Sequence, residues 1–353
     1  MKWLKNNLVP IAMLILGLVS FKYAAVSVNF LASEVFTRFI RNMLFVLALI
    51  LPVTCGMGIN FAIIVGAISA QMAIVFALDL NLTGLPVMLF VIVLSILLAA
   101  LFGALVAWLL NKARGNEMIV SIMIGQISSV LYQFVFMVVY GLVIQPKNKD
   151  ILLASGVGVR SMLDAGNISN AFKQILPFTM DGKVYSALPL IIIALFTLLL
   201  IYLQHSKLGI LAKAVGSDLR NSTLIGINSD RIRAICIIIS TVFAAMSQVL
   251  TVADYGTIQV YTGHVGIDTY AAAAILVGGA SIKEAKLRNC FIGVLLFHTL
   301  FITSPMAGQI LFNNPSVGEY FRSFLAYGII VIAIIMNLKN EKDRKLEDFT
   351  AEL

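Results

Sequence analysis

Long apolar runs alternate with short polar segments along most of the chain. Most of the runs approach the ~20 residues that an α-helix needs to cross the hydrocarbon core of a bilayer. The pattern predicts about ten membrane-spanning helices, which cover residues 8–21, 40–54, 59–78, 85–110, 118–144, 188–203, 234–253, 269–279, 290–310 and 324–338. Because several of these are short or are interrupted by Pro and Gly, we predict an all-α polytopic membrane protein with broken and short helices.

One apolar run is too long for a single helix. Residues 43–78 are apolar almost throughout, well beyond the ~20 residues that one span needs. The run is interrupted by three residues that disfavour a helix, Pro52, Gly56 and Gly58. We therefore predict a helix, a non-helical break around the two glycines, and a second helix. A segment outside the membrane, containing Arg38 and Arg41, is predicted just before this run.

The composition excludes a soluble globular protein. The 353 residues are 60% hydrophobic and 12% charged, with a mean hydropathy of +0.98, whereas about 25% of the residues of a soluble domain are charged. The net charge of +8 follows here from basic loops on one face of a bilayer, so no nucleic-acid partner is expected. Cys55, Cys236 and Cys290 lie in or beside apolar runs at no metal-ligand spacing, which indicates neither a disulfide framework nor a metal site.

Basic loops set the predicted topology. The polar segment 204–233 carries five Lys or Arg against two acids, and such an excess in a loop between spans marks the cytoplasmic side. Two tighter basic loops fall on the same side, as do both termini and the tail, residues 339–353. The long polar segment 145–186 is then extracytoplasmic. The whole chain, residues 1–353, is expected to form one transmembrane domain.

The 204–233 segment has an internal pattern of its own. Small and apolar residues around Ala214 form a short amphipathic stretch, and Gly216 is predicted to break it. Ser217 and Asp218 are suited to cap a second short helix that runs to Gly226. Two short helices joined by a glycine would make a docking surface on the cytoplasmic side.

These residues resemble those of a known family. Gly209, residues 212–216 and the run Gly226-Ile227-Asn228 are similar to the K-x-G…R-A-x-G-x-N…A…x-G-I-N loop of permease subunits in bacterial ABC importers of the ribose, simple-sugar and nucleoside superfamily. Residues 115–123 resemble the G-x-N-E-V-I-x-T-L-M segment of its nucleoside-importer branch, and residues 274–296 resemble its last third.

The resemblance implies a fold, a location and a set of partners. The fold would be a bundle like that of type II importers, in the bacterial cytoplasmic (inner) membrane. The 204–233 loop would sit in a groove of the ATP-binding subunit, through the coupling residues Ala214, Gly216, Ser217, Asp218 and Gly226. The partners would be two ATP-binding subunits, a second permease subunit, identical or different, and an extracytoplasmic solute-binding protein.

The chemistry of ATP would belong to those partners. The chain contains no G-x-x-x-x-G-K-[ST] motif, so it is not expected to bind ATP or magnesium itself. It also lacks an H-E-x-x-H motif or a paired-carboxylate arrangement, and its histidines, His205, His264 and His298, are isolated from one another. No catalytic residue, cofactor or metal is predicted, and the chain is not expected to be an enzyme.

Small and polar residues also recur at corresponding places in the two halves of the chain. Residues 56–60 read Gly-Met-Gly-Ile-Asn, and residues 266–268 read Gly-Ile-Asp. Transporters often carry internal repeats whose interrupted helices meet near the substrate path. We therefore predict an internal repeat, with Asn60 and Asp268 as candidate substrate ligands. The alternative interpretation is glycine-mediated packing of helices.

Amide side chains within the spans complete the expected substrate pathway. Gln71, Gln126 and Gln133 are predicted to lie along it with Asn60 and Asp268. Gln126 and Gln133 are seven residues apart and therefore share one helical face. Such neutral groups suit a solute rich in hydroxyls. The alternative is that these glutamines only form hydrogen bonds between helices.

The expected function is the membrane-spanning subunit of an ATP-driven importer that translocates a nucleoside or a simple sugar-type solute. The alternative is an ion-coupled secondary transporter of a small polar solute. Such transporters usually need ionisable residues within the spans, and the predicted spans are nearly free of Asp and Glu. The ATP-driven importer is therefore favoured.

Overall fold

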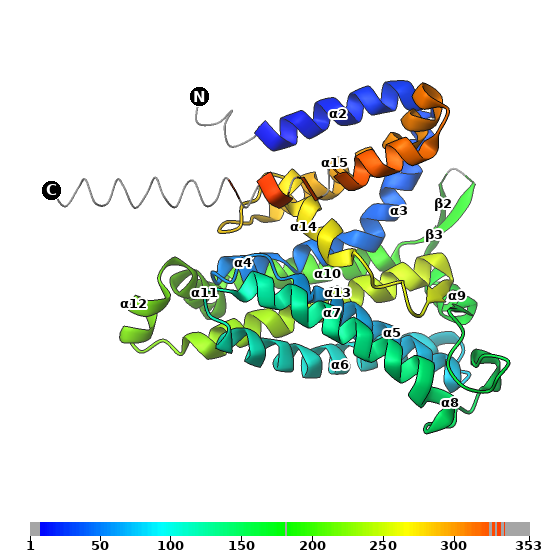
Figure 1. Ribbon diagram of the computed structural model, residues 1–353, viewed down its shortest axis with the longest axis horizontal. Coiled ribbons are helices and arrows are strands. Elements are labelled where there is room, and N and C mark those ends of the chain that lie inside the picture. The colour runs from blue at the N-terminus through cyan, green and yellow to red at the C-terminus, as the bar shows by residue number, and fades with distance from the viewer. Residues whose placement is uncertain (1–7, 181, 325–326, 329, 333–334, 336–353) are drawn as a thin grey trace. The chain divides into compact units, whose positions relative to one another are not determined.

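The computed structural model describes residues 8–180, 182–324, 327–328, 330–332 and 335. The chain forms two compact units, one consisting of Phe36–Asp268 and the other of Met1–Val35 with Thr269–Leu353 (Figure 1). In the described part, seven helices are long and apolar enough to cross a membrane: Val28–Thr54, Phe61–Asp79, Gly84–Lys112, Glu117–Leu142, Leu188–His205, Ser229–Tyr255 and Leu287–Phe312. The prediction of a helical polytopic membrane protein is confirmed at this level.

Two further apolar helices are shorter than a full span. α2 (Leu8–Ala24) occupies the first predicted span, and α14 (Ile267–Val277) occupies the short one at 269–279. The last predicted span, 324–338, lies largely outside the described residues, and the tail 339–353 lies wholly outside them. The number of ten spans and the internal repeat stay predictions.

The segment containing Arg38 and Arg41, predicted to lie outside the membrane, is helical and forms part of the apolar helix Val28–Thr54; its position relative to the membrane stays a prediction. Both residues belong to α3 (Val28–Leu47). Arg41 forms an ion pair with Asp254, and its guanidinium carbon lies 3.7 Å from the centre of the Tyr255 ring. The carboxylate and the aromatic face compensate the charge. Because these partners come 213 and more positions later in the chain, local hydropathy did not reveal them.

The predicted break after the second helix is confirmed. α4 (Ile50–Thr54) ends before it, and the chain resumes with the 3-10 turn η1 (Phe61–Ile63) and α5 (Ile64–Asp79). Gly56 and Gly58 have φ angles of +78° and +71°. Glycine adopts this left-handed region without the steric cost that a Cβ atom would add, so the two glycines permit the turn.

Helix α13 (Ser229–Tyr255) packs against both α5 and α6 (Gly84–Lys112) in the core of the Phe36–Asp268 unit. Glycines allow the close approach. A Cβ atom on Gly66 would lie 2.3 Å from the Thr241 carbonyl oxygen, and one on Gly103 would lie 2.1 Å from the Thr241 hydroxyl. The same hydroxyl donates a 3.0 Å hydrogen bond to the Ala99 carbonyl. Small residues and a hydroxyl that forms a hydrogen bond between two helices are typical of helix contacts within membranes.

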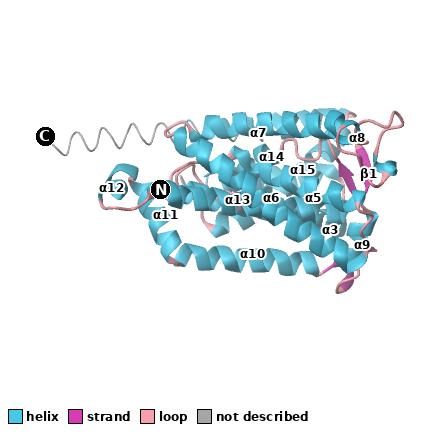
Figure 2. Cartoon of the chain, turned by 90° about the horizontal axis from the view of Figure 1, so that it is seen from below, coloured by secondary structure: helices cyan, strands magenta, loops and turns pink. Residues whose placement is uncertain are grey.

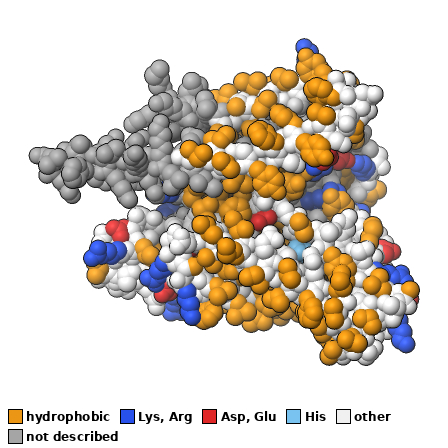
Figure 3. Space-filling model, viewed as in Figure 1, with side chains coloured by type: hydrophobic (Ala, Val, Ile, Leu, Met, Phe, Trp, Pro, Cys, Tyr) orange, Lys and Arg blue, Asp and Glu red, His pale blue; other side chains and the backbone are white. Residues whose placement is uncertain are grey.

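The outer helices of this unit present apolar faces. Figure 2 shows α7 (Glu117–Phe134) and α10 (Leu188–His205) at opposite edges, with α13, α5 and α6 between them. On α6, exposed Leu97, Leu101 and Leu105 recur every four residues and so form one stripe. In Figure 3, hydrophobic side chains cover the flank of this unit, while charged side chains gather at its α12 end and its α8–α9 end. This is the distribution that a bilayer requires.

The long polar segment after α7 is folded. Together with the residues that follow α13 it contains the π-helical turn η2 (Val135–Val139), α8 (Tyr140–Leu142), η3 (Lys149–Ile151), β1 (Met162–Asp164), α9 (Gly166–Lys173), β2 (Pro177–Met180), β3 (Lys183–Ser186) and β4 (Thr257–Gln259). β1 pairs with β4 and β2 with β3, both antiparallel. Asp79, the last residue of α5, accepts 3.0 Å hydrogen bonds from the Tyr140 hydroxyl and the Asn148 amide. These contacts fasten the segment to the bundle.

The other unit is built around α15 (Leu287–Phe312). α15 packs against α2, and glycines again bring helices together. A Cβ atom on Gly293 would lie 1.9 Å from the Ala274 carbonyl oxygen on α14. The Asn289 side-chain amide donates a 2.7 Å hydrogen bond to the Gly278 carbonyl, which closes the end of α14 onto α15.

Candidate functional site

The loop between α10 and α13 folds into two short helices, α11 (Lys207–Ser217) and α12 (Leu219–Leu224). The break between them falls at Asp218, whose φ and ψ of −154° and 102° are extended. Its Oδ1 atom accepts a 2.9 Å hydrogen bond from the Asn221 amide and so caps α12. The predicted cap is confirmed, whereas the prediction that Gly216 breaks the helix was wrong. Gly216 lies in the last turn of α11.

Gly216 has a different reason to be a glycine. A Cβ atom there would lie 2.2 Å from the Thr54 carbonyl oxygen and 3.0 Å from the Gly56 amide nitrogen. In return, a Cβ atom on Gly56 would lie 2.9 Å from the Gly216 Cα. The end of α11 therefore rests with its backbone directly on the break that follows α4. Two features that the sequence suggested separately, the 204–233 loop and the Gly56–Asn60 break, meet at this contact.

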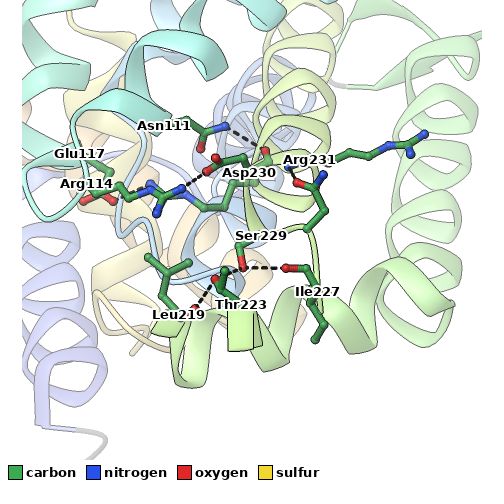
Figure 4. Close-up of polar contacts among 11 residues, drawn as sticks. Asn111, Arg114, Glu117, Leu219, Thr223, Ile227, Ser229, Asp230 and Arg231 are labelled. Carbon is green, nitrogen blue, oxygen red and sulfur yellow. Dashed lines mark hydrogen bonds and ion pairs between the residues drawn. The ribbon is translucent and has the colours of Figure 1, made fainter. Parts of the chain in front are cut away.

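Hydrogen bonds hold α12 to its neighbours. The Ser222 hydroxyl donates to the Ala214 carbonyl at 2.9 Å, and the hydroxyls of Thr223 and Ser229 lie 3.1 Å apart (Figure 4). Gly226 follows with a φ angle of +86°, which ends this part of the loop. The apolar side chains of Leu224 and Ile225 are 75% and 76% exposed at the tip. The loop thus has a fixed base and an exposed apolar tip.

Ion pairs join the start of α13 to the loop between α6 and α7. Figure 4 shows Arg114 directed at the carboxylate of Asp230, and the Asn111 side chain donates a 2.9 Å hydrogen bond to the Asp230 carbonyl. A second pair joins Arg233 to Glu117, whose side chains are only 3% and 12% exposed. Glu117 begins α7, where the helix dipole also favours a carboxylate. Sequence analysis did not predict either ion pair.

Asn60 lies at the break, and both the oxygen and the nitrogen of its side-chain amide form hydrogen bonds. Its Oδ1 atom accepts a 3.0 Å hydrogen bond from the Ala62 amide, which caps η1. Its Nδ2 atom donates to the Ser240 hydroxyl on α13 at 3.3 Å, and the side chain is buried. These contacts favour the packing interpretation of Asn60.

We expect Asn60→Ala to lower the stability of the protein without changing its apparent affinity for solute. The substitution removes a cap, worth about 1 kcal/mol, and a hydrogen bond between helices, worth about 0.6 kcal/mol. Thermal unfolding in detergent and concentration-dependent uptake measure the two quantities. Ser240→Ala, which removes only the bond between helices, should show the smaller loss. Weakened apparent affinity of Asn60→Ala at unchanged stability would place Asn60 in the pathway.

The remaining pathway candidates lie in different surroundings. Gln71 is buried on α5 and lies 3.0 Å from the His264 ring through its Oε1 atom. Gln133 is half-buried and donates a 3.0 Å hydrogen bond to the Tyr261 carbonyl, whereas Gln126 is exposed. Asp268 is buried in the first turn of α14. The structure brings Gln71 and Gln133 to the segment that follows β4.

His264 belongs to that segment, and sequence analysis had set it aside as isolated. Its side chain is buried, and removal from water lowers its pKa to about 4. His264 is therefore neutral near pH 7. The signal that could have found it is the pair of polar residues, Gln71 and Gln248, in otherwise apolar helices, because buried amides need partners.

Apolar helices packed through glycines, a broken helix and a capped two-helix loop resting on that break define the class of this chain as a polytopic helical membrane protein. The chain belongs to the family described as branched-chain amino acid transport system / permease component, whose sequence profile matches residues 31–334. It is thus an ABC importer permease of the branched-chain amino acid, ribose and sugar superfamily.

Three relatives illustrate the similarity. The high-affinity branched-chain amino acid transport system permease protein BraD of Pseudomonas aeruginosa is 26% identical over 206 residues, which cover 53% of this chain and 62% of BraD. Its counterpart LivH of Salmonella typhimurium is 34% identical over 96 residues, 27% of this chain and 31% of LivH. The galactofuranose transporter permease protein YtfT of Escherichia coli is 24% identical over 185 residues, 52% of this chain and 53% of YtfT. The chain spans less than two thirds of each relative, and no solved structure matches it.

Proposed function

We propose that this chain is the membrane-spanning subunit of an ATP-driven importer that moves a nucleoside or sugar-type solute into the cytoplasm. The observation that carries the proposal is the backbone contact of Gly216 with Thr54 and Gly56. It gives the α11–α12 loop a rigid connection to the break at residues 55–60. A displacement of the loop would then move that break, which lies between two membrane-spanning helices.

The proposed partners follow from the loop and the family. Two ATP-binding subunits would bury the exposed tip at Leu224 and Ile225 in a groove, and a second permease subunit, identical or different, would complete the pathway. A solute-binding protein would dock on the folded segment 145–186. The apolar tip supports the docking of the ATP-binding subunits. Hydrogen bonds already hold the base of the loop in place, so the tip can bind a partner with little loss of conformational entropy.

A hydroxyl-rich solute is supported by the neutral amides of Gln71 and Gln133 and by the similarity to a galactofuranose permease. A branched-chain amino acid is the second candidate, because BraD and LivH are named as permeases for such solutes.

Uptake by the complete importer in proteoliposomes separates the two solute classes. Labelled uridine and D-ribose should accumulate with ATP and should compete with each other. Accumulation of L-leucine alone would contradict the solute class. No ATP-dependent uptake of any labelled solute would contradict the transport role.

The proposed topology predicts which residues a membrane-impermeant maleimide reaches in intact cells. Asn167→Cys in α9 should react from outside, and Arg220→Cys in α12 should react only after lysis, because both side chains are exposed on segments at opposite faces of the proposed topology. The native cysteines Cys55, Cys236 and Cys290 are all buried, so background labelling should be low. The reverse pattern of labelling would overturn the orientation.

A further inference from the structure

Four polar side chains meet within the Phe36–Asp268 unit, where a bilayer-embedded bundle is expected to be apolar. They are Gln71 of α5, Tyr132 of α7, Gln248 of α13 and His264, and we call them the polar cluster. Each side chain is at most 4% exposed. Gln71 and Tyr132 contact the His264 ring, and the Gln248 amide donates a 3.3 Å hydrogen bond to the carbonyl of the preceding residue, Gly263. The polar cluster is therefore built around the turn that contains Gly263 and His264.

The hydrogen bonds within the polar cluster fix which atoms are donors. The Gln71 Nε2 atom donates to the Gln259 carbonyl at 3.4 Å, so its Oε1 atom is the one that faces His264 Nδ1 at 3.0 Å. A carbonyl oxygen can only accept, hence Nδ1 carries the hydrogen. With the pKa of His264 lowered by burial, the ring is neutral, and Nε2 is a free acceptor.

Three atoms of the polar cluster are buried without a hydrogen-bond partner among the described residues. They are the Tyr132 hydroxyl, Gln248 Oε1 and His264 Nε2. Each such group costs about 1–3 kcal/mol when it is left unpaired, and buried polar atoms are nearly always paired with protein or water. Three of them on side chains around one turn indicate a site for a ligand rather than three separate packing defects.

Tyr132 is held in place by contacts that do not involve its hydroxyl. Its ring packs on Phe136 with centroids 4.9 Å apart and meets the His264 ring edge-on at 5.3 Å. The π-helical turn η2 follows, and the Phe136 carbonyl accepts a hydrogen bond from the Val159 amide at 2.8 Å. π-Helical turns inside helices are frequent at functional sites. The ring is thus rigidly positioned while its hydroxyl stays available.

We propose that Tyr132, Gln248 and His264 form one buried binding site for a neutral molecule that offers two O–H hydrogens. Gln248 Oε1 and His264 Nε2 accept those hydrogens, and the Tyr132 hydroxyl donates to an oxygen of the same molecule. A sugar diol and an ordered water share this chemistry. A carboxylate has no hydrogen for two acceptors, and the three side chains carry no negative charge to balance an ammonium group. If the bound molecule is a sugar, the inference rests on the proposed function; if it is an ordered water, it does not.

Tyr132→Phe tests the site, because it removes the unpaired hydroxyl and keeps the ring. With D-ribose present, loss of a real hydrogen bond should lower the Tm of the purified chain in detergent by roughly 2–4 °C relative to the wild type. Gln248→Met should also lower it, and the double variant should lose less than the sum, because both groups bind the same molecule. Tyr261→Phe is the control: its hydroxyl already donates to the Val159 carbonyl at 2.6 Å, so its loss of Tm should be the same with and without D-ribose.

Adding D-ribose, with L-leucine as the comparison, shows whether a solute or a water molecule occupies the site. If a solute diol occupies the site, D-ribose raises the Tm of the wild-type chain and not that of Tyr132→Phe, and L-leucine raises neither. If water occupies it, the loss in Tyr132→Phe is the same with and without D-ribose, whatever the importer carries. With D-ribose present, a Tm of Tyr132→Phe at or above that of the wild type would overturn the proposal, because removing a truly unpaired hydroxyl is neutral or stabilising.

Discussion

Glu117→Ala should lower the free energy of unfolding by about 3–5 kcal/mol, the usual cost of removing one partner of a buried ion pair. The Arg233 side chain is 3% exposed and would keep its charge without the carboxylate of Glu117. The loss would loosen the start of α13 from the start of α7, at the base of the α11–α12 loop. Thermal or denaturant unfolding of the purified chain in detergent measures it.

Arg114→Ala is the matched control for this substitution. It breaks the neighbouring pair with Asp230, whose side chains are 47% and 52% exposed, and pairs in water are worth less than about 1 kcal/mol. The double variant Glu117→Ala/Arg233→Met should recover most of the lost stability, because an apolar side chain leaves no buried charge. Equal losses in Glu117→Ala and Arg114→Ala would contradict the account of this pair.

Local patterns in the sequence predicted the features that depend on a few neighbouring residues. The apolar runs gave the helices, the glycines at 56 and 58 gave the break, and Asp218 gave the cap of α12. Each of these depends on spacing or on backbone conformation within one or two turns. The position of Gly216 was misread because a glycine near a helix end suggests a stop, whereas its role lies in a contact with a distant part of the chain.

Contacts across long stretches of sequence could not be predicted. The ion pair of Arg41 could not be predicted, because its partner Asp254 is 213 residues away. Arg233 and Glu117 are 116 residues apart, and no local pattern in either segment predicts that they pair. The polar cluster escaped notice for the same reason, since His264 looked isolated until α5 and α13 brought Gln71 and Gln248 to it.

Gly216→Ala should reduce solute uptake at least tenfold while the protein still reaches the membrane. The new Cβ atom would meet the Thr54 carbonyl oxygen at 2.2 Å, which is backbone and cannot rotate away, so α11 must move off the break. Gly125→Ala is the matched control, because this helical glycine on α7 would place a Cβ atom no closer than 3.5 Å to its neighbours. It should leave uptake near the wild-type level.

The central claim is that the contact of Gly216 with the Gly56 break connects ATP hydrolysis to transport. Its most direct test is to measure ATP hydrolysis and solute uptake together, in proteoliposomes that contain the complete importer with wild-type, Gly216→Ala or Gly125→Ala permease. The account predicts that Gly216→Ala hydrolyses ATP but loses uptake, while Gly125→Ala keeps both. Uptake by Gly216→Ala at the wild-type ratio of solute moved to ATP hydrolysed would contradict it.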